Sequence, residues 1–325
     1  MPLYRIGNRT LDSNMPLPGL AEITRGRPHA TFRIRPPGEP VATSPGWFNH
    51  WRGPDDRIWL SFARYGIGYL LRFVGLADFE LATNGLWIEC TPLPGTPIDT
   101  ITHLLLDQVV PIALSMRGNL VIHASAVEIQ RSAVAFVGRS GRGKSTLAAS
   151  FALQGFRLMS DDCLLLAERQ SELMVMPTYP GVRLWEDSIQ MLFAQTPALG
   201  RVAHYNNKKR LALNNGQVHF YRGRAPLRRM YFVADPAETV GKQPITITAL
   251  SAREAFMELV AHSFKLNVDE RSMIAREFHL LNRIATLPLF FRLSFPHDFS
   301  LLPDVHRAIL GHLDTGRLVA NALDD

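Results

Sequence analysis

The sequence has few of the features that mark membrane, disulfide-stabilised or disordered proteins. Its 325 residues include only two cysteines, Cys90 and Cys163. Their separation fits neither a CxxC metal clip nor a disulfide framework, so we interpret both as reduced, packed thiols. No run approaches the ~20 apolar residues of a membrane helix, and Met1 to Thr10 lacks the apolar core of a signal peptide. These absences predict a cytoplasmic protein without a membrane partner.

Composition permits a folded core and says little about partners. The chain is 46% hydrophobic and 20% charged, and we find no internal repeat or low-complexity tract, so one large or two modest domains are expected. The net charge of +6 suits an acidic partner or a nucleic acid. Because most basic proteins are merely soluble, the charge alone does not predict nucleic-acid binding.

The pattern of apolar residues divides the chain into three parts. Residues 57–89 alternate apolar runs with turn signals such as Asn84-Gly85, which is typical of a small antiparallel sheet, so a β-rich module is expected over 1–97. Residues 98–116 have helical spacing that Pro111 is expected to kink, which predicts a connecting helix over 98–119. The third part, 120–325, is the predicted catalytic domain.

A glycine-rich segment in the third part carries the strongest signal. Apolar strands are expected over 120–129 and 133–137, and the second leads into Gly138-Arg139-Ser140-Gly141-Arg142-Gly143-Lys144-Ser145. A helix is expected over 144–154, ending at Gly155 in the C′ position. A strand, a loop of the form GxxxxGKS and a helix together indicate a P-loop.

A P-loop binds a nucleotide by physical means that each residue type supplies. Glycines let successive N–H groups converge on phosphate oxygens at a helix N-terminus. Lys144 would add a positive charge over the β- and γ-phosphates, and the Ser145 hydroxyl would bind Mg²⁺. The cofactors expected are therefore ATP and Mg²⁺. The residues expected to bind nucleotide are Gly138, Arg139, Ser140, Gly141, Arg142, Gly143, Lys144, Ser145 and Thr146.

Two adjacent carboxylates follow the next strand. Strands are expected over 156–160 and 163–166, with Asp161 and Asp162 between them. One carboxylate could serve the metal while the other accepts the proton of an incoming hydroxyl. A solvated Asp-Asp turn is the simpler alternative. His123 in the preceding apolar strand is a further candidate, although a lone histidine there is more often a packed core residue.

Further helices are expected in the C-terminal part. Ser251 and Glu254 have the spacing of a capping box, which predicts a helix from there to about Ser263. Helical patterns also cover 270–285 and 303–313.

These segments together resemble the HPr kinase/phosphorylase family, which has a GxSGxGKS loop, an upstream histidine and an Asp-Asp pair. The resemblance implies an α/β catalytic domain akin to phosphoenolpyruvate carboxykinase rather than to Ras-like GTPases. It implies Asp161 as general base, with Asp162 and His123 beside it, and Ser145 and Asp162 toward the metal. Arg183 matches a family arginine. The family has glutamates where this chain has Gly181 and Thr146, so metal binding could pass to Glu186 or Asp187, and reversibility could differ.

The chain is more closely similar to HPr-kinase-like proteins encoded with lasso-peptide biosynthesis genes, which phosphorylate the C-terminal serine of a precursor peptide. This similarity covers most of the chain, including 13–18, 75–79, 103–111, 123–127, 160–163, 179–187 and 208–211. It implies a peptide or protein acceptor as partner. Lys208-Lys209-Arg210 is expected to help neutralise the transferring phosphoryl group. HPr kinases form hexamers, so a homo-oligomer is possible.

Three functions remain open from the sequence. The first is a serine kinase acting on a peptide or protein. The second is a bifunctional kinase/phosphorylase that also removes the phosphate with inorganic phosphate. The third is a P-loop ATPase or nucleotide switch without a phosphoacceptor, because a P-loop alone does not separate these classes.

Overall fold

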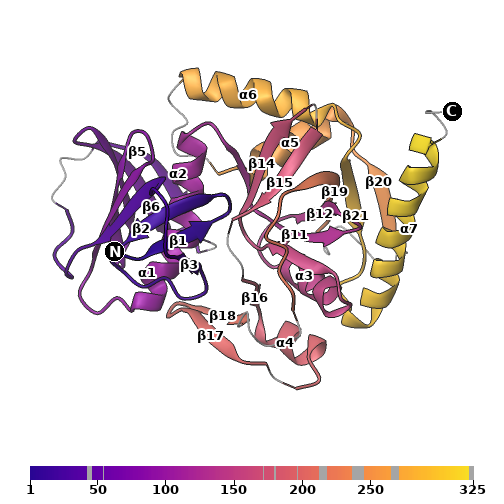
Figure 1. The fold of residues 1–325 in the computed structure, drawn as a ribbon, viewed down its shortest axis with the longest axis horizontal. Coiled ribbons are helices and arrows are strands. Elements are labelled where there is room, and N and C mark those ends of the chain that lie inside the picture. Colours follow the sequence, from indigo (N-terminus) through magenta and orange to yellow (C-terminus); the bar gives the residue numbers. More distant parts are fainter. Residues whose placement is uncertain are drawn as a thin grey trace. The chain divides into compact units, whose positions relative to one another are not determined.

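The computed structural model describes residues 1–41, 46–53, 55–170, 172–178, 181–195, 197–211, 218–235, 245–264 and 271–321, without the side chains of 272 and 316–321. The chain forms two compact units (Figure 1). The first comprises Met1–Val121, Gly200–Lys209 and Phe264–Phe278, and the second comprises Ile122–Leu199, Arg210–Ser263 and His279–Asp325. Within the described ranges, no helix has the length and apolar character needed to cross a membrane.

A nine-stranded sheet dominates the first unit. In sheet order, its strands are β3 (Ala21–Ile23), β1 (Leu3–Ile6), β2 (Arg9–Ser13), β4 (Ala30–Ile34), β9 (Trp87–Pro92), β8 (Ala77–Ala82), β7 (Gly68–Phe73), β6 (Ile58–Tyr65) and β5 (Trp47–Arg52). The antiparallel sheet expected over 57–89 is confirmed by the consecutive pairing of β6 to β9. β4 pairs in parallel with both β2 and β9, a connection that the sequence pattern did not predict.

The helical segment of the first unit is interrupted before its proline. It consists of α1 (Ile98–Leu104), a π-helical turn (Leu105–Val109) and α2 (Val110–Met116). Pro111 lies in the first turn of α2, where its missing N–H costs little. The helix is interrupted by a π-helical turn that ends before Pro111, while a kink at the proline itself stays a prediction. Near it, Tyr205 from the 200–209 segment packs edge-on against Trp59.

A second large sheet organises the second unit. In sheet order it contains β14 (Leu164–Arg169), β15 (Glu172–Pro177), β19 (Ala225–Val233), β12 (Ser132–Val137), β11 (Ala124–Ile129) and β13 (Arg157–Ser160). β21 (Phe290–Ser294) runs parallel to β19 and antiparallel to β20 (Thr246–Ala249). β10 (Leu120–Ile122) precedes β11 along the chain. All six residues of β11 are buried, as in a strand that is covered on both faces.

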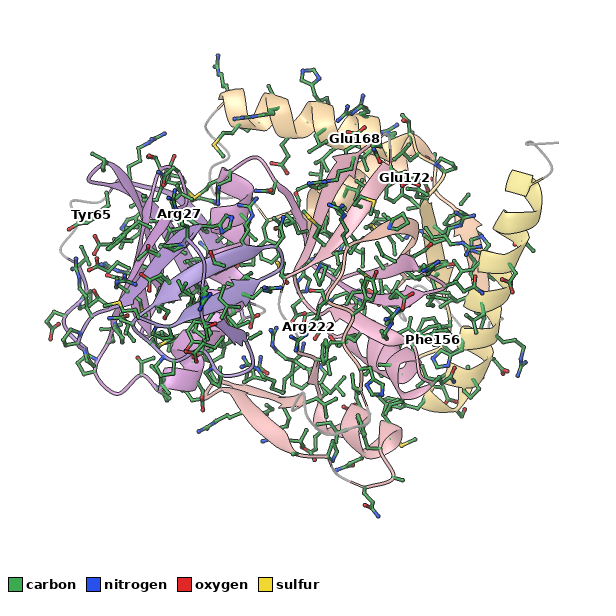
Figure 2. All side chains as sticks on the ribbon, in the orientation of Figure 1. Arg27, Tyr65, Phe156, Glu168, Glu172 and Arg222 are labelled. Carbon is green, nitrogen blue, oxygen red and sulfur yellow. The ribbon has the colours of Figure 1, made fainter. Side chains whose placement is uncertain are left out.

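One helix of the second unit follows the glycine-rich segment. α3 (Lys144–Leu153) buries Leu147, Ala148 and Phe151 against β11 to β13. The expected stop is confirmed: Gly155 has a φ of 93°, and its N–H bonds to the Ala152 carbonyl while that of Phe156 bonds to the Phe151 carbonyl. These two bonds form a Schellman motif. Figure 2 shows Phe156 just beyond α3, where its ring contacts that of Phe151.

The remaining helices and strands are divided between the two units. They are β16 (Arg183–Leu184), α4 (Glu186–Leu192), β17 (Leu199–Ala203), β18 (Asn206–Leu211), α5 (Ala252–His262), α6 (Arg271–Ala285), a 3₁₀ turn (Phe299–Leu301) and α7 (Leu302–Asn321). The capping box is confirmed, with Ser251 and Glu254 bonding reciprocally at the start of α5. Glu168 near the tip of the β14–β15 hairpin pairs with Arg283 of α6 (Figure 2).

Candidate active site

The glycine-rich loop, Gly138–Gly143, connects β12 directly to α3. Gly138 is closely approached by the neighbouring strand, because a Cβ there would lie 3.2 Å from the carbonyl oxygen of Val233 in β19. Gly143 takes a left-handed φ of 82° at the N-cap of α3, which only glycine adopts without strain. The first turn of a helix leaves N–H groups without intrahelical partners. The loop therefore presents such groups at a position that suits an anion.

Lys144 lies buried at the first position of α3. Its side chain is 5% exposed, and its Nζ donates to the carbonyl oxygen of Arg139 at 3.2 Å. The ammonium group is thus held over the loop it belongs to. A phosphate bound at the loop would meet this charge without a large movement of the main chain.

The two loop arginines have different surroundings. Arg139 is exposed, as is Ser140. Arg142 forms a close ion pair with Asp235, which follows β19, the strand beside β12. The loop is therefore tied to the carboxyl end of its neighbouring strand. Arg142 is expected from this geometry to act as an anchor of the loop.

Asp161 lies at the centre of the site and is 1% exposed. Its Oδ1 accepts from the Ser125 hydroxyl at 2.5 Å and from the Ser145 hydroxyl at 2.8 Å, and its Oδ2 accepts from the backbone N–H of Arg183 at 2.9 Å. Burial raises the pKa of this carboxyl, and the neighbouring charge of Asp162 raises it further. Asp161 thus links β11, α3 and β16 at one point.

Asp162 faces a different set of partners. Its Oδ2 accepts from the Arg183 guanidinium, and its Oδ1 lies 3.8 Å from Nε2 of His123. The main chain of Asp162 is left-handed, with a φ of 65°, a conformation that aspartate tolerates better than most residues. Because of this backbone conformation, the two adjacent carboxylates point into different surroundings. The side chain of Asp162 is more exposed to solvent than that of Asp161.

His123 interrupts the strand that was expected to run unbroken over 120–129. Its backbone N–H donates to the carbonyl oxygen of His262, and β10 and β11 lie on either side of it. Its Nδ1 lies 3.1 Å from the carbonyl oxygen of Asp162. The ring is about one-third exposed, so it is half-buried at the rim of the site.

Arg183 is fully buried although it is charged. It is 2% exposed and contacts Asp161 through its backbone and Asp162 through its guanidinium. A buried guanidinium needs such partners, because an isolated charge is costly to desolvate. Arg183 thus positions the carboxylates of both Asp161 and Asp162.

The other predicted residues lie on α3, α4 and β18. The Thr146 hydroxyl contacts that of Ser188 in α4, at 3.0 Å. Glu186 and Asp187 are exposed at the start of α4. Lys208, Lys209 and Arg210 all lie on β18, where Lys209 belongs to the first unit and Arg210 to the second. Their role on a phosphoryl group stays a prediction. Residues 179 and 180, part of the family resemblance, lie outside the described residues.

Sequence reasoning missed two residues of this site. Ser125 donates to Asp161, and Asp235 holds Arg142. The sequence does contain a signal for Ser125: it is a polar residue two positions after His123, in an apolar strand close to the glycine-rich loop. Asp235 ends an apolar strand in the way that Asp161 does. Neither sign reveals which strands are neighbours.

The donor set suits a hard divalent cation that arrives with a nucleotide. Ser145 and Asp161 offer oxygen atoms, which Mg²⁺ prefers. Within the described residues, no group of three or more His, Cys, Asp or Glu side chains could hold a metal by itself. Mg²⁺ usually binds through one or two protein oxygens together with phosphates and water, so these residues fit it as part of a nucleotide complex.

The fold makes the chain a mixed α/β protein with large sheets. Neither a protein-family model nor a curated protein sequence matches it. In structure it is similar to the HPr(Ser) kinase/phosphatase from Coxiella burnetii, with 11% sequence identity, over 61% of this chain and 97% of that one. The TM-score of 0.32 is too low to define a shared fold. The function therefore has to be inferred from the site.

Proposed function

We propose that this chain is an ATP-dependent kinase that phosphorylates a hydroxyl group on a peptide or protein. The observation that carries the proposal is the hydrogen bond from Ser145, at the start of α3, to Asp161, with Asp162 adjacent in the chain. The Ser145 hydroxyl and the Asp161 carboxylate together suit Mg²⁺. The Asp162 carboxylate would then be available to accept the proton of the acceptor hydroxyl. Simple nucleotide binding does not require the second carboxylate.

In the proposed reaction, the bond between the γ-phosphorus of ATP and its bridging oxygen breaks as the acceptor oxygen bonds to the same phosphorus. The acceptor proton passes to a carboxylate, and ADP leaves. Mg²⁺, when bound, offsets negative charge on the phosphates. The chain itself would cradle the phosphates with the amides of the glycine-rich loop and Lys144, and Arg183 would fix the positions of the carboxylates.

The hydrogen bonds favour one division of work between the two aspartates. Asp161 is buried and already accepts from Ser145, which suits a group that orients the metal side of the site. Asp162 is more exposed and lies near the half-buried His123, which suits the proton acceptor. The family resemblance instead implies Asp161 as the base. Substituting each aspartate separately distinguishes the two assignments.

The resemblance also suggests the acceptor, namely the C-terminal serine of a lasso-peptide precursor. The test is the intact mass of candidate peptides after incubation with ATP and Mg²⁺, with peptides ending in alanine as matched controls. We expect a gain of one phosphate on the serine peptide and none on the control. ATP consumption without any labelled acceptor would contradict the kinase proposal and favour an ATPase or switch. Release of the phosphate on adding inorganic phosphate would identify a bifunctional enzyme.

A further inference from the structure

Ser125 is a polar residue on a fully buried strand. All six residues of β11 are buried, and the Ser125 side chain has no exposed surface. Its hydroxyl donates a hydrogen bond of 2.5 Å to Oδ1 of Asp161. A buried hydroxyl needs a partner, and backbone groups are the commonest ones. Here the partner is instead a carboxylate of the candidate active site, although the proposed phosphoryl transfer does not itself require this hydroxyl.

The order of the strands explains this contact. β11 lies between β12, which leads into the glycine-rich loop, and β13, which leads to Asp161. Ser125 pairs with Phe136 of β12, and the next residue, Ala126, pairs with Ser160 of β13. Because this second pairing is antiparallel, Ser125 lies across from Asp161. Side chains of opposite residues in neighbouring strands lie close together. The topology of the sheet therefore places Ser125 between the loop and the carboxylate.

Three donors hold the Asp161 carboxylate in one orientation. An ionised carboxylate can only accept hydrogen bonds, so the hydroxyls of Ser125 and Ser145 both donate to Oδ1. Oδ2 accepts from the backbone N–H of Arg183. Of the two hydroxyls, that of Ser125 comes from a strand within the sheet, whereas Ser145 belongs to the helix that follows the loop. The Ser125 bond therefore fixes the carboxylate independently of the loop.

The carboxylate in turn orients the Ser145 hydroxyl. Since the proton of that hydroxyl points at Asp161, the lone pairs of its oxygen point away from the carboxylate. A lone pair on this oxygen is what a Mg²⁺ ion would bind. Hydrogen bonds behind a metal ligand fix its direction, and their removal typically costs about 10–100-fold in metal affinity or activity. The bond between Ser125 and Asp161 has the place of such an interaction.

We propose that Ser125 is a positioning residue, which holds the Asp161 carboxylate so that Ser145 presents its oxygen to the Mg²⁺ of MgATP. Ser125 acts through Asp161, because its own side chain is fully buried and has no surface for a ligand. This role rests on the nucleotide binding that the proposed function includes. It does not depend on phosphoryl transfer or on the acceptor, so the two proposals can fail separately.

The first experiment is calorimetry of ATP binding to the full-length chain, once with Mg²⁺ and once with EDTA in its place. We expect Ser125→Ala to weaken the binding of MgATP about tenfold, because the metal-facing hydroxyl is no longer fixed from behind. The binding of ATP without Mg²⁺ should stay within about twofold of wild type. An unchanged affinity for MgATP, or an equal loss with and without Mg²⁺, would overturn the proposal.

Ser150→Ala is the matched control. Ser150 is another buried serine of the second unit, and its hydroxyl contacts His306 instead of Asp161. Both variants remove a buried, hydrogen-bonded hydroxyl and should lower the melting temperature. Only Ser125→Ala should change the dependence of ATP binding on Mg²⁺. The same change in Ser150→Ala would show a general loss of stability and would contradict a specific role for Ser125.

A double variant tests whether Ser125 acts through Asp161. Adding Ser125→Ala to Asp161→Asn should weaken MgATP binding by no more than about twofold beyond Asp161→Asn alone, because residues in contact are not additive. A further tenfold loss would mean that Ser125 acts independently of Asp161, which contradicts the proposal.

Two measurements apply if Ser125→Ala does not fold. Ser125→Cys keeps a similar shape with a weaker donor, so its loss of MgATP affinity should lie between those of wild type and a full removal. In a structure of the wild-type chain with MgATP, the Ser125 hydroxyl should stay within about 3 Å of Asp161. A broken contact in that complex would overturn the role of Ser125. MgATP binding that follows the expected pattern without phosphorylation of any peptide would instead contradict the kinase proposal alone.

Discussion

The hydroxyl group of Ser145 and the carboxylate of Asp161 are joined by a hydrogen bond of 2.8 Å, which links the start of α3 to the end of β13. This bond gives Asp161 a set of partners different from that of Asp162, although the two are adjacent in sequence. The Ser125 hydroxyl completes the surroundings of Asp161, and Arg183 and His123 provide those of Asp162. The two carboxylates are therefore expected to differ in function.

Asn substitutions should separate the two aspartates. Asp162→Asn should leave the affinity for MgATP within about threefold of wild type and slow phosphoryl transfer by about 10²–10⁴-fold, the usual contribution of a general base. Asp161→Asn should weaken MgATP binding about tenfold or more, because the amide lacks the negative charge and its NH₂ group cannot accept from the Arg183 N–H. Calorimetry and single-turnover kinetics measure the two effects. If Asp161→Asn instead keeps its nucleotide affinity and loses transfer, Asp161 is the base.

Lys144→Ala should remove most of the affinity for ATP. The ammonium group is already held over the glycine-rich loop, so its loss removes a charge where the β- and γ-phosphates are expected. We expect the dissociation constant to rise at least tenfold, with an unchanged melting temperature as evidence of folding. Wild-type affinity in this variant would rule out the loop as the nucleotide site.

The ion pair between Arg142 and Asp235 should affect nucleotide binding through the loop. We expect Arg142→Gln and Asp235→Asn each to weaken ATP binding about threefold to tenfold, because either change releases the loop from β19. The double variant should be little worse than either single one, since contacting residues are not additive. Arg139→Gln is the exposed control. Tighter binding in Asp235→Asn would mean that Arg142, once released, contacts the phosphates itself.

His123 should contribute less than either aspartate. We expect His123→Ala to slow transfer roughly tenfold, because its Nε2 lies near Asp162 without a short contact. His123→Asn should retain a donor toward the Asp162 carbonyl and so isolate the loss of Nε2. The readout is the pH dependence of kcat/KM. A profile identical to that of wild type in both variants would show that the histidine only packs.

His306 should make the stability of the protein depend on pH. It lies between α7 and α3, where its Nε2 contacts the Ser150 hydroxyl at 2.7 Å, and burial lowers its pKa to about 4. Since its pKa in the unfolded chain is about 6.5, stability is complete above that value and declines as the pH falls toward 4. We expect a loss of about 2 kcal/mol at pH 5, because the ring is buried and only the unfolded chain takes up the proton readily at that pH.

Thermal unfolding between pH 7 and pH 4.5 measures this effect. His306→Gln should flatten the dependence, whereas the exposed His219→Gln should not. An equal loss of stability with pH in wild type and His306→Gln would assign the sensitivity to other groups.

Local signals in the sequence predicted local structure well. The strand, loop and helix around Lys144, the stop at Gly155 and the cap at Ser251 all depend on residues that are close in sequence. The partners of Asp161 and Arg142 depend instead on which strands are neighbours. Periodicity cannot reveal that β19 lies beside β12, so Asp235 could not be identified as a partner of the loop.

The expected strand over 120–129 shows a second limit. Its pattern is mainly apolar on both sides of His123, and nothing in that pattern indicates that His262 would take the backbone N–H. The two units, each built from separate segments of the chain, show a third limit of prediction from sequence. The boundaries at 97 and 119 follow from the pattern of apolar residues along the chain, which cannot assign residues 200–209 and 264–278 to the first unit.

The segments of the two units alternate along the chain, and this order affects folding during synthesis on the ribosome. Because the first unit draws on Phe264–Phe278, its last piece is synthesised only after most of the second unit has been translated. The nine-stranded sheet itself ends at Pro92, but the unit gains its last segment only after some 140 residues beyond Val121 have emerged, which at about 5–20 residues per second takes many seconds. A fragment cut at residue 121 would contain every strand of that sheet and would lack the two later segments of its unit.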